Sequence, residues 1–366
     1  MLIAGGGTGG HLFPGIAVAE EVVTRAKGNE VVFVGTDRGL EARVVPAAGF
    51  KLETIRAQGL KGVGPVKLIK ALFALPLSFI ESWQILRRHR PDVVVGVGGY
   101  SSGPVVLAAW MQGIPTAVQE QNALPGMTNK ILGRFVNVAF VAFEDARRFF
   151  PSAKVQLVGN PIRRALMDNY LRSTVAHDRF SVLVFGGSLG ARAINQRMQD
   201  ALDHLGDLSE QLHFVHQTGK SDTDAVRKAY ADRGFSAEVL EFIDDMSKAY
   251  ARAELVVCRA GATTLAELTV CKKASILIPF PYATDDHQTK NAKALVDAGA
   301  AVMLKESELS GERLANEIRA LIGDPERRRK MEKKAGLMGR PEAAKELADV
   351  CVQLMVDKYG PKGRET

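Results

Sequence analysis

Several apolar segments of this chain end in a glycine-rich turn and then continue with helical periodicity. The first glycine turn spans residues 4–11, the second spans 98–104 and the third spans 186–192. Where a strand passes into a helix through glycines, bare backbone N–H groups and the positive end of the helix dipole face outward and can bind phosphate. Repeated strand–turn–helix units are typical of parallel, doubly wound α/β sheets, so this pattern strongly constrains the fold.

The chain of 366 residues is longer than one core usually supports, which favours two domains. The strand–glycine turn–helix plan of the first half begins again at residue 181, and residues 159–163 break the pattern sharply. We expect domains at 1–160 and 161–340, followed by a C-terminal amphipathic helix and tail at 341–366. Strands are predicted at 31–35, 92–97, 115–118, 138–141 and 155–158, and then at 181–185, 213–219, 237–243, 255–258 and 275–279.

Cysteine usage and the first residues indicate a reducing compartment. The three cysteines form no C-x-x-C pair and are too few for a disulfide framework. Residues 1–3 run directly into the first glycine turn, without the basic and apolar regions of a secretory signal. We therefore expect a cytoplasmic protein.

One basic, apolar segment accounts for most of the excess positive charge. Residues 1–160 hold 17 Lys and Arg against 11 Asp and Glu, and within them residues 56–90 hold seven against one. The longest uncharged run of this segment, 71–80, is too short to cross a bilayer. Residues 68–83 are predicted to form a helix pair around Pro76, which either lies on an anionic membrane surface or is buried with solvated basic ends.

Four positions carry chemistry that packing does not require. His11 ends the first turn and could accept a proton near neutral pH. Glu120 stands in a run of amides where a parallel strand opens onto a cleft, and Glu267 follows a small-residue turn where its carboxylate could bind ribose hydroxyls. Asp37 follows the second strand, where a dinucleotide-binding fold holds a ribose, although a plain loop aspartate explains it as well.

The motifs together are specific for a family. They are GGTGGH at 6–11 with Pro14 and Gly15, GGYSSGP at 98–104, EQN at 120–122, GNPIR at 159–163, GGSLGA at 186–191, EFIDDM at 241–246 and CRAGA at 258–262. In this order they resemble the bacterial MurG family, the UDP-N-acetylglucosamine:lipid I N-acetylglucosaminyltransferases of peptidoglycan synthesis. The resemblance covers roughly residues 1–350. It implies a GT-B fold of two Rossmann-like domains facing each other across a cleft, with the lipid acceptor on the N-terminal domain and the donor mainly on the C-terminal one.

The resemblance also implies a set of site residues. The donor contacts fall on Thr8, Gly9, Gly10, Asn122, Arg163, Ser188, Ile243, Ala262, Thr263, Thr264, Leu265, Ala266, Glu267, His287 and Gln288. In the family pattern Ile243 meets the uracil through its backbone, Glu267 holds the ribose, and Ser188 with Arg163 approaches the diphosphate. His287 stands where some members have a glutamine. Catalytic candidates are His11, the first choice for the base, and Glu120.

The implied reaction is an inverting transfer of N-acetylglucosamine to the 4-hydroxyl of the N-acetylmuramoyl group of lipid I, which gives lipid II and UDP. Glycine-turn N–H groups, helix dipoles and Arg163 could stabilise the departing diphosphate. We expect no built-in metal, no cofactor and no nucleic-acid partner. The partners implied are UDP-GlcNAc, lipid I, an anionic membrane surface, and the cell-wall and division machinery.

Lipid I is embedded in the membrane, so the resemblance favours the membrane-surface interpretation of the basic segment and a peripheral location on the cytoplasmic face of the inner membrane. The expected docking residues are Lys67, Lys70, Leu72, Phe73, Leu75, Phe79, Trp83, Arg87 and Arg88. Three alternatives stay open: a UDP-GlcNAc epimerase of the same fold, an NAD-dependent oxidoreductase suggested by the first turn and Asp37, and a non-catalytic UDP-sugar sensor or membrane scaffold.

Overall fold

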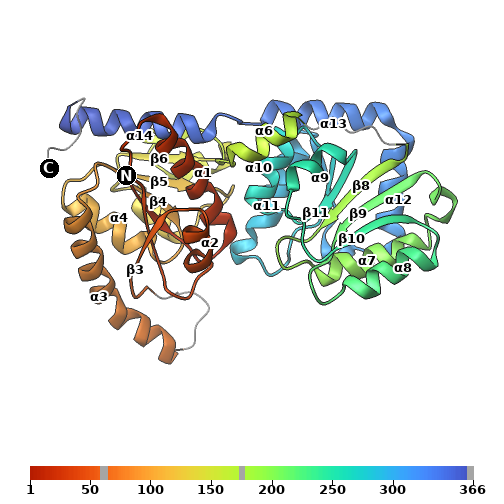
Figure 1. Cartoon of the computed structure of the whole chain (residues 1–366), viewed down its shortest axis with the longest axis horizontal. Helices are drawn as coiled ribbons and strands as arrows, with labels where there is room; N and C mark the ends of the chain where they lie inside the picture. Colours follow the sequence, from red (N-terminus) through yellow and green to blue (C-terminus); the bar gives the residue numbers. More distant parts are fainter. Residues whose placement is uncertain (58–64, 173–177, 361–366) are drawn as a thin grey trace. The chain divides into compact units, whose positions relative to one another are not determined.

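The computed structural model describes residues 1–57, 65–172 and 178–360, and for 65–74 it describes the backbone alone (Figure 1). Packing divides the chain into unit 1, Met1–Arg164 with Pro341–Thr366, and unit 2, Ala165–Arg340. Each unit is built on one parallel sheet, which confirms the predicted doubly wound α/β architecture. Among the described residues, no helix combines the length and the hydropathy needed to cross a membrane.

The described part of unit 1 holds a seven-stranded sheet in the order β3-β2-β1-β4-β5-β6-β7, with every pair parallel. Its strands are β1 (Leu2–Gly5), β2 (Val32–Gly35), β3 (Lys51–Thr54), β4 (Val94–Gly98), β5 (Thr116–Glu120), β6 (Val138–Val141) and β7 (Val155–Leu157). The order reverses between β1 and β4, and at such a switch point the carboxyl ends of two central strands open a ligand-binding crevice. The first and second glycine turns follow these two strands.

Helices cover both faces of this sheet and include one from the end of the chain. They are α1 (Gly9–Arg25), α2 (Glu41–Ala47), α3 (Pro65–His89), α4 (Ser102–Met111), α5 (Met127–Leu132), the 3-10 helix η1 (Glu144–Phe149) and α14 (Ala343–Tyr359). Leu347, Ala348 and Cys351 of α14 are fully buried in the core beside α1. Arg25 of α1 also bonds the Asp349 carboxylate at 2.7 Å. The amphipathic C-terminal segment therefore returns to pack on unit 1.

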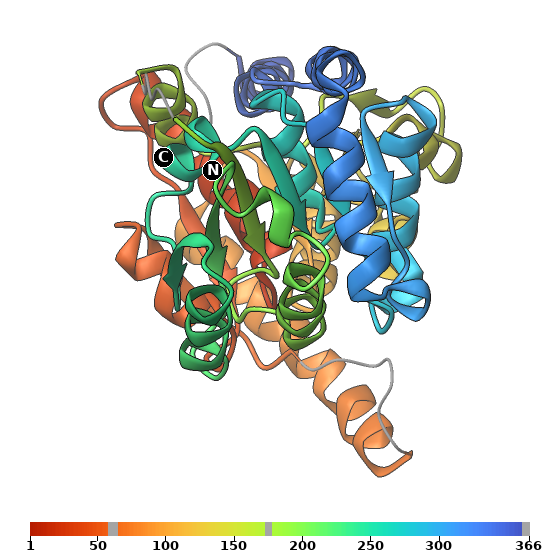
Figure 2. The same cartoon turned by 90° about the vertical axis from the view of Figure 1, so that its right-hand side faces the viewer.

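The predicted helix pair around Pro76 is wrong, because α3 is one helix that runs through this proline. Proline removes one intrahelical hydrogen bond, and its ring is tolerated here on an exposed side of the helix. The opposite side holds the helix against unit 1 through the fully buried Ser82 and the buried Leu86. Both views show the first turns of α3 projecting from the rest of unit 1 (Figures 1 and 2).

The described part of unit 2 holds a six-stranded parallel sheet in the order β10-β9-β8-β11-β12-β13. Its strands are β8 (Phe180–Phe185), β9 (Leu212–Gln217), β10 (Ser236–Leu240), β11 (Leu255–Cys258), β12 (Ser275–Leu277) and β13 (Ala301–Met303). Its α-helices are α6 (Arg164–Arg172), α7 (Arg192–Leu202), α8 (Thr223–Asp232), α9 (Met246–Arg252), α10 (Ala262–Val270), α11 (His287–Asp297), α12 (Gly311–Gly323) and α13 (Pro325–Met338), with the 3-10 helices η2 (Gly206–Leu208), η3 (Thr284–Asp286) and η4 (Glu306–Glu308). The carboxyl ends of β8 and β11 again lead into the glycine and small-residue turns.

Candidate active site

The first two glycine turns of unit 1 are nested backbone against backbone. Gly98 and Gly99 have φ values of +96° and +83°, which favour glycine at both positions. A Cβ added at Gly99 would overlap the carbonyl oxygen of Gly6. The two turns can therefore approach this closely only because these residues lack side chains.

His11 lies in the first turn of α1, over the second glycine turn. A Cβ at Gly98 would fall 2.8 Å from the Cδ2 of His11, so the imidazole ring covers this glycine. The Nδ1 of His11 lies 3.1 Å from the hydroxyl oxygen of the exposed Thr8. If Nδ1 carries the proton and donates it to Thr8, the lone pair is on Nε2, which is the tautomer a general base needs.

Glu120 ends β5 and is 1 % exposed. Its Oε1 accepts from the backbone N–H and the side-chain amide of Asn122 at 2.9 and 3.1 Å. Its Oε2 accepts from the Gly126 N–H at 3.1 Å and the Asn129 amide at 2.9 Å. Burial raises the pKa of this carboxyl, and the four donors oppose that rise. The geometry suits holding Asn122 and the following loop in place.

Arg163 follows β7 and is exposed near the end of unit 1's main segment. Its guanidinium lies 5.6 Å from the ring centroid of Phe13, on α1. Burial raises the pKa of the nearby Glu20 carboxyl, and the Arg163 charge opposes that rise. This places the arginine beside α1, the helix that begins at the first glycine turn.

In unit 2 the third glycine turn is tied to the backbone at Ile243 through one side chain. Gln217, at the end of β9, donates its amide to the Gly187 carbonyl at 2.7 Å and accepts from the Ile243 N–H at 3.2 Å. A Cβ at Gly190 would overlap the Thr218 carbonyl, which explains the glycine. Ser188 is exposed at the tip of this turn. The turn and the buried Ile243 are therefore held as one unit.

The small-residue turn after β11 leads into α10, whose first residues are Ala262, Thr263 and Thr264. Glu267 lies farther along this helix with Leu265 and Ala266, and is half-buried. The fully buried Tyr250 donates its hydroxyl to the Glu267 Oε2 at 2.9 Å, which fixes the carboxylate. A carboxylate held in this way can accept hydrogen bonds from a pair of hydroxyls.

His287 and Gln288 begin α11 close to this turn. The Gln288 Oε1 accepts from the backbone N–H groups of Ala260 and Phe280 at 3.2 and 2.9 Å, so its amide bridges two loops. The His287 Nδ1 lies 2.7 Å from the Thr284 carbonyl, which orients the ring. Within the described ranges, no group of three or more His, Cys, Asp or Glu side chains is arranged to hold a metal.

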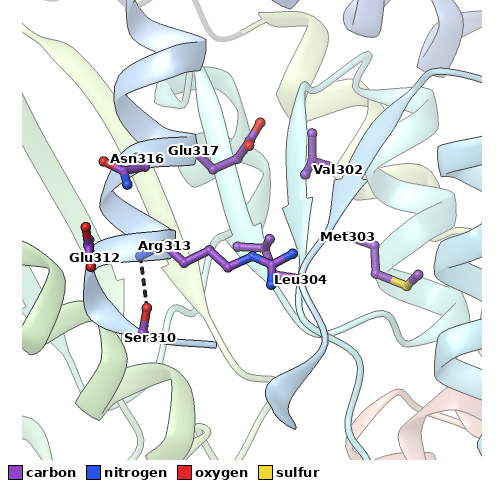
Figure 3. Close-up of a pocket in the computed structure, with 8 residues that line it drawn as sticks. All are labelled: Val302, Met303, Leu304, Ser310, Glu312, Arg313, Asn316 and Glu317. Carbon is purple, nitrogen blue, oxygen red and sulfur yellow. Dashed lines mark hydrogen bonds between the residues drawn. The ribbon is translucent and has the colours of Figure 1, made fainter. Parts of the chain in front are cut away.

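A pocket of about 370 Å³ lies elsewhere in unit 2, between β13 and α12 (Figure 3). Two of its charged lining residues are paired: Arg313 bonds Glu308 at 3.0 Å, and Glu317 accepts from Arg327 at 2.7 Å. The Ser310 side chain caps the helix by accepting from the Arg313 N–H. No residue of this pocket belongs to the predicted site.

A buried histidine of β9 bonds α7, the helix that follows the third glycine turn. His216 is fully buried; its Nδ1 lies 3.1 Å from the Tyr230 hydroxyl and its Nε2 3.1 Å from the Asn195 Oδ1. The Asn195 amide nitrogen donates to the Thr218 carbonyl, so its oxygen faces the ring and Nε2 carries the proton. Burial lowers the pKa of His216 to about 3.

This burial predicts an acid-sensitive stability. The folded state keeps His216 neutral, whereas the unfolded chain binds a proton below the ordinary pKa of 6.5, so stability falls as the pH drops from 6.5 towards 3. The contribution is about 1.4 kcal/mol per pH unit in that window. His216→Gln keeps one donor and one acceptor but does not titrate, so its melting temperature should fall less than the wild type's between pH 7.5 and 5.5. Equal losses in thermal melts would contradict this assignment.

Three side chains that the sequence did not single out contact the predicted turns and residues: Gln217, Tyr250, and Glu41, which accepts from the Gly7 N–H at 2.9 Å. Each holds a turn or a carboxylate from behind, and each contacts a partner distant in sequence. A glutamate at the start of a helix or an amide at the end of a strand is too common to be noticed alone. No local signal in the sequence separates them from ordinary helix and strand termini.

Two doubly wound parallel-sheet units in one chain, with glycine turns after their central strands, define the GT-B class of fold. The Glycosyltransferase family 28 N-terminal domain profile matches residues 1–141, and the family 28 C-terminal domain profile matches residues 181–347. The chain belongs to glycosyltransferase family 28.

Relatives of high identity cover the whole chain. This chain is 76% identical over 365 residues to a protein of Myxococcus xanthus strain DK1622, the UDP-N-acetylglucosamine--N-acetylmuramyl-(pentapeptide) pyrophosphoryl-undecaprenol N-acetylglucosamine transferase. The match covers 100% of this chain and 95% of the relative. A protein of the same name from Anaeromyxobacter dehalogenans strain 2CP-1 is 62% identical, over 98% of this chain and 94% of that one.

Among solved structures, MurG of Acinetobacter baumannii superposes with a TM-score of 0.80 and 32% identity, covering 96% of this chain and 98% of that chain. A putative UDP-N-acetylglucosamine 2-epimerase from Listeria monocytogenes has a TM-score of 0.70 at 16% identity, covering 100% and 99%. The second likeness shows the shared fold alone.

Proposed function

We propose that this protein transfers N-acetylglucosamine from UDP-GlcNAc to the 4-hydroxyl of the N-acetylmuramoyl group of lipid I, forming lipid II for peptidoglycan synthesis. The observation that carries the proposal is the 76% identity over the full chain to a transferase named for moving N-acetylglucosamine to this lipid-linked acceptor. The enzyme is thus a UDP-GlcNAc-dependent hexosyltransferase. Its donor is UDP-GlcNAc and its acceptor is the diphosphate-linked lipid.

The donor-binding residues that we propose in unit 2 follow the ends of its strands. Ser188 and the third glycine turn offer N–H and hydroxyl donors to the diphosphate, Glu267 accepts from the ribose hydroxyls, and the Ile243 backbone meets the uracil. The Ile243 N–H already donates to the Gln217 side chain at 3.2 Å. The Ile243 carbonyl is therefore the simpler contact for the uracil ring. His287, Gln288 and residues 262–266 complete this surface.

The residues of unit 1 supply the proton acceptor and further hydrogen-bond donors for the diphosphate of UDP-GlcNAc. Transfer requires a base for the attacking hydroxyl and stabilisation of the charge that grows on UDP. We assign the base to His11 rather than Glu120, because the Glu120 oxygens already accept four hydrogen bonds inside the protein. Thr8, Gly9, Gly10, Asn122 and Arg163 act on the donor.

Incubation of labelled UDP-GlcNAc with and without a short-chain lipid I analogue separates this function from its rivals. We expect UDP release and a disaccharide-lipid product that depend on the acceptor. An epimerase would convert the nucleotide sugar without the analogue, and a sensor or scaffold would bind it without turnover. Either of those results would contradict the proposal.

We further propose that helix α3 docks unit 1 on the cytoplasmic face of the cell membrane. In its described part, Leu75, Leu77 and Ile80 are exposed, with Ile80 52% accessible. Arg87 lies 5.8 Å from the ring centroid of the half-buried Trp83. Exposed apolar side chains beside arginines favour the interface of an anionic bilayer. The side chains of Lys67, Lys70, Leu72 and Phe73 lie outside the described residues.

Charge reversal tests this docking. Replacement of Lys67, Lys70, Arg87 and Arg88 together by glutamate should release the protein from vesicles containing anionic lipid, since each basic residue near the surface contributes about 1 kcal/mol. UDP-GlcNAc binding should remain. As a matched control, the same reversal at Lys228, Lys293, Lys333 and Lys334, which are exposed on unit 2, should leave more protein on the vesicles in co-sedimentation. Equal binding by both variants would contradict docking through α3.

A further inference from the structure

A buried carboxylate holds the first glycine turn from behind. Glu41, the first residue of α2, is 1 % exposed. Its Oε2 accepts from the Gly7 N–H at 2.9 Å, and its Oε1 accepts from the Thr36 N–H at 3.0 Å and the Thr36 hydroxyl at 2.7 Å. The carboxylate therefore joins the turn after β1 to the turn after β2.

Glycines without side chains surround this carboxylate on several sides. A Cβ at Gly6 or Gly39 would overlap the Glu41 carboxylate, and one at Gly35 would lie 2.6 Å from its Cγ. Three glycines from two separate turns thus pack directly on one side chain. Burial alone would raise the pKa of Glu41, but the hydrogen bonds from Gly7, from its own backbone N–H and from Thr36 outweigh burial and lower it. Glu41 is therefore an ionised acceptor at neutral pH.

The turn that Glu41 holds is the one that carries Thr8 and His11. Gly7 adopts a φ of +89°, a conformation that glycine reaches readily because it lacks a Cβ, and a Cβ there would meet nothing within 4 Å. The Glu41 bond to the Gly7 N–H thus constrains a residue that side-chain packing does not. On the other side of the turn, Gly6 contacts Gly99 and His11 covers Gly98.

We infer that Glu41 is a positioning residue for transfer, which fixes the first glycine turn so that His11 and Thr8 meet their substrates in the reactive geometry. This inference rests on the proposed function. Glu41 itself is buried, and we assign it no contact with substrate. It acts through the Gly7 N–H, and a small displacement of a reacting group is enough to cost a large factor in rate.

The test uses Glu41→Gln, which keeps the shape of the side chain but turns one acceptor into a donor. The amide has one oxygen in place of two, so it cannot accept from Gly7 and Thr36 with separate oxygens. The N–H of one of them then faces the NH2 group of the amide. We expect kcat for disaccharide-lipid formation to fall about 10- to 100-fold, while the affinity for UDP, measured by calorimetry, changes by less than about threefold. Circular dichroism and thermal melting would establish that the variant is folded at the assay temperature.

Thr36→Val is the matched control. It removes one donor from the same carboxylate and leaves the Gly7 bond, so kcat should stay within about threefold of wild type even where the melting temperature falls. A second measurement places Glu41→Gln in a His11→Ala background. There it should lower the residual rate little further, because Glu41 is proposed to act by positioning His11.

Three outcomes would overturn the inference: a folded Glu41→Gln enzyme with wild-type kcat, an equal loss in Thr36→Val, or a loss that multiplies fully with that of His11→Ala. These outcomes leave the proposed function intact, because they presuppose an active wild-type enzyme. A wild-type protein that forms no disaccharide product would instead remove the proposed function.

Discussion

Replacement of His11 by alanine should lower the rate of N-acetylglucosamine transfer by about 10²- to 10⁴-fold, the range typical of a lost general base. The physical reason is the position of the ring over Gly98, with Nδ1 3.1 Å from Thr8. In the tautomer where Thr8 accepts from Nδ1, the Nε2 lone pair can take the proton of the attacking hydroxyl. UDP affinity should change little, since the uracil and ribose contacts are assigned to unit 2.

The matched measurement compares kcat of His11→Ala and Glu120→Gln with the same lipid I analogue. If His11 is the base, kcat should fall much further in His11→Ala than in a folded Glu120→Gln variant. Glu120→Gln should lose stability, because its four internal donors no longer face a carboxylate. Full transfer activity in folded His11→Ala would remove the histidine from this role.

Glu267→Gln should weaken UDP-GlcNAc binding by about 10- to 100-fold, because hydrogen bonds to a charged acceptor contribute about 1.5–3 kcal/mol. The carboxylate is held by the Tyr250 hydroxyl at 2.9 Å, so it is oriented before the donor arrives. Replacing it by an amide removes the charge and one of the acceptor positions. The loss should appear in the dissociation constant measured by calorimetry with UDP.

A nucleotide lacking one hydroxyl isolates the ribose contact. Wild type should bind UDP more tightly than 2′-deoxy-UDP, and this difference should shrink in Glu267→Gln, since the partner of the hydroxyl is then impaired. Tyr250→Phe, which leaves Glu267 in place but removes the bond from the Tyr250 hydroxyl, should give a smaller loss of the same kind. An unchanged preference for UDP in Glu267→Gln would contradict the assignment of the ribose to this carboxylate.

The sequence reveals those parts of the site whose residues are contiguous. Each glycine turn directly follows an apolar run and is only about seven residues long, so its strand–turn–helix geometry could be predicted. The parallel sheets could be predicted from the repetition of this unit. The short edge strands β3 and β13 were missed. Lys51 and Thr54 in β3 are exposed, and an edge strand paired on one side needs no continuous apolar run.

The supporting residues could not be predicted because their partners are far away along the chain. Glu41 is 34 positions from Gly7, Gln217 is 26 from Ile243, and Tyr250 is 17 from Glu267. Likewise, the amphipathic pattern of residues 342–358 predicts an apolar face but not which core receives it. Only the fold shows that this face packs beside α1.

The linkage of the product is the decisive measurement, because the proposed transfer forms one defined glycosidic bond. Wild-type protein, UDP-GlcNAc and a lipid I analogue should yield one disaccharide-lipid per UDP released. Nuclear magnetic resonance of that product should show a β-configured N-acetylglucosamine on the 4-oxygen of the muramoyl group. An α-linkage, attachment at another hydroxyl, or UDP release without any disaccharide would contradict the account.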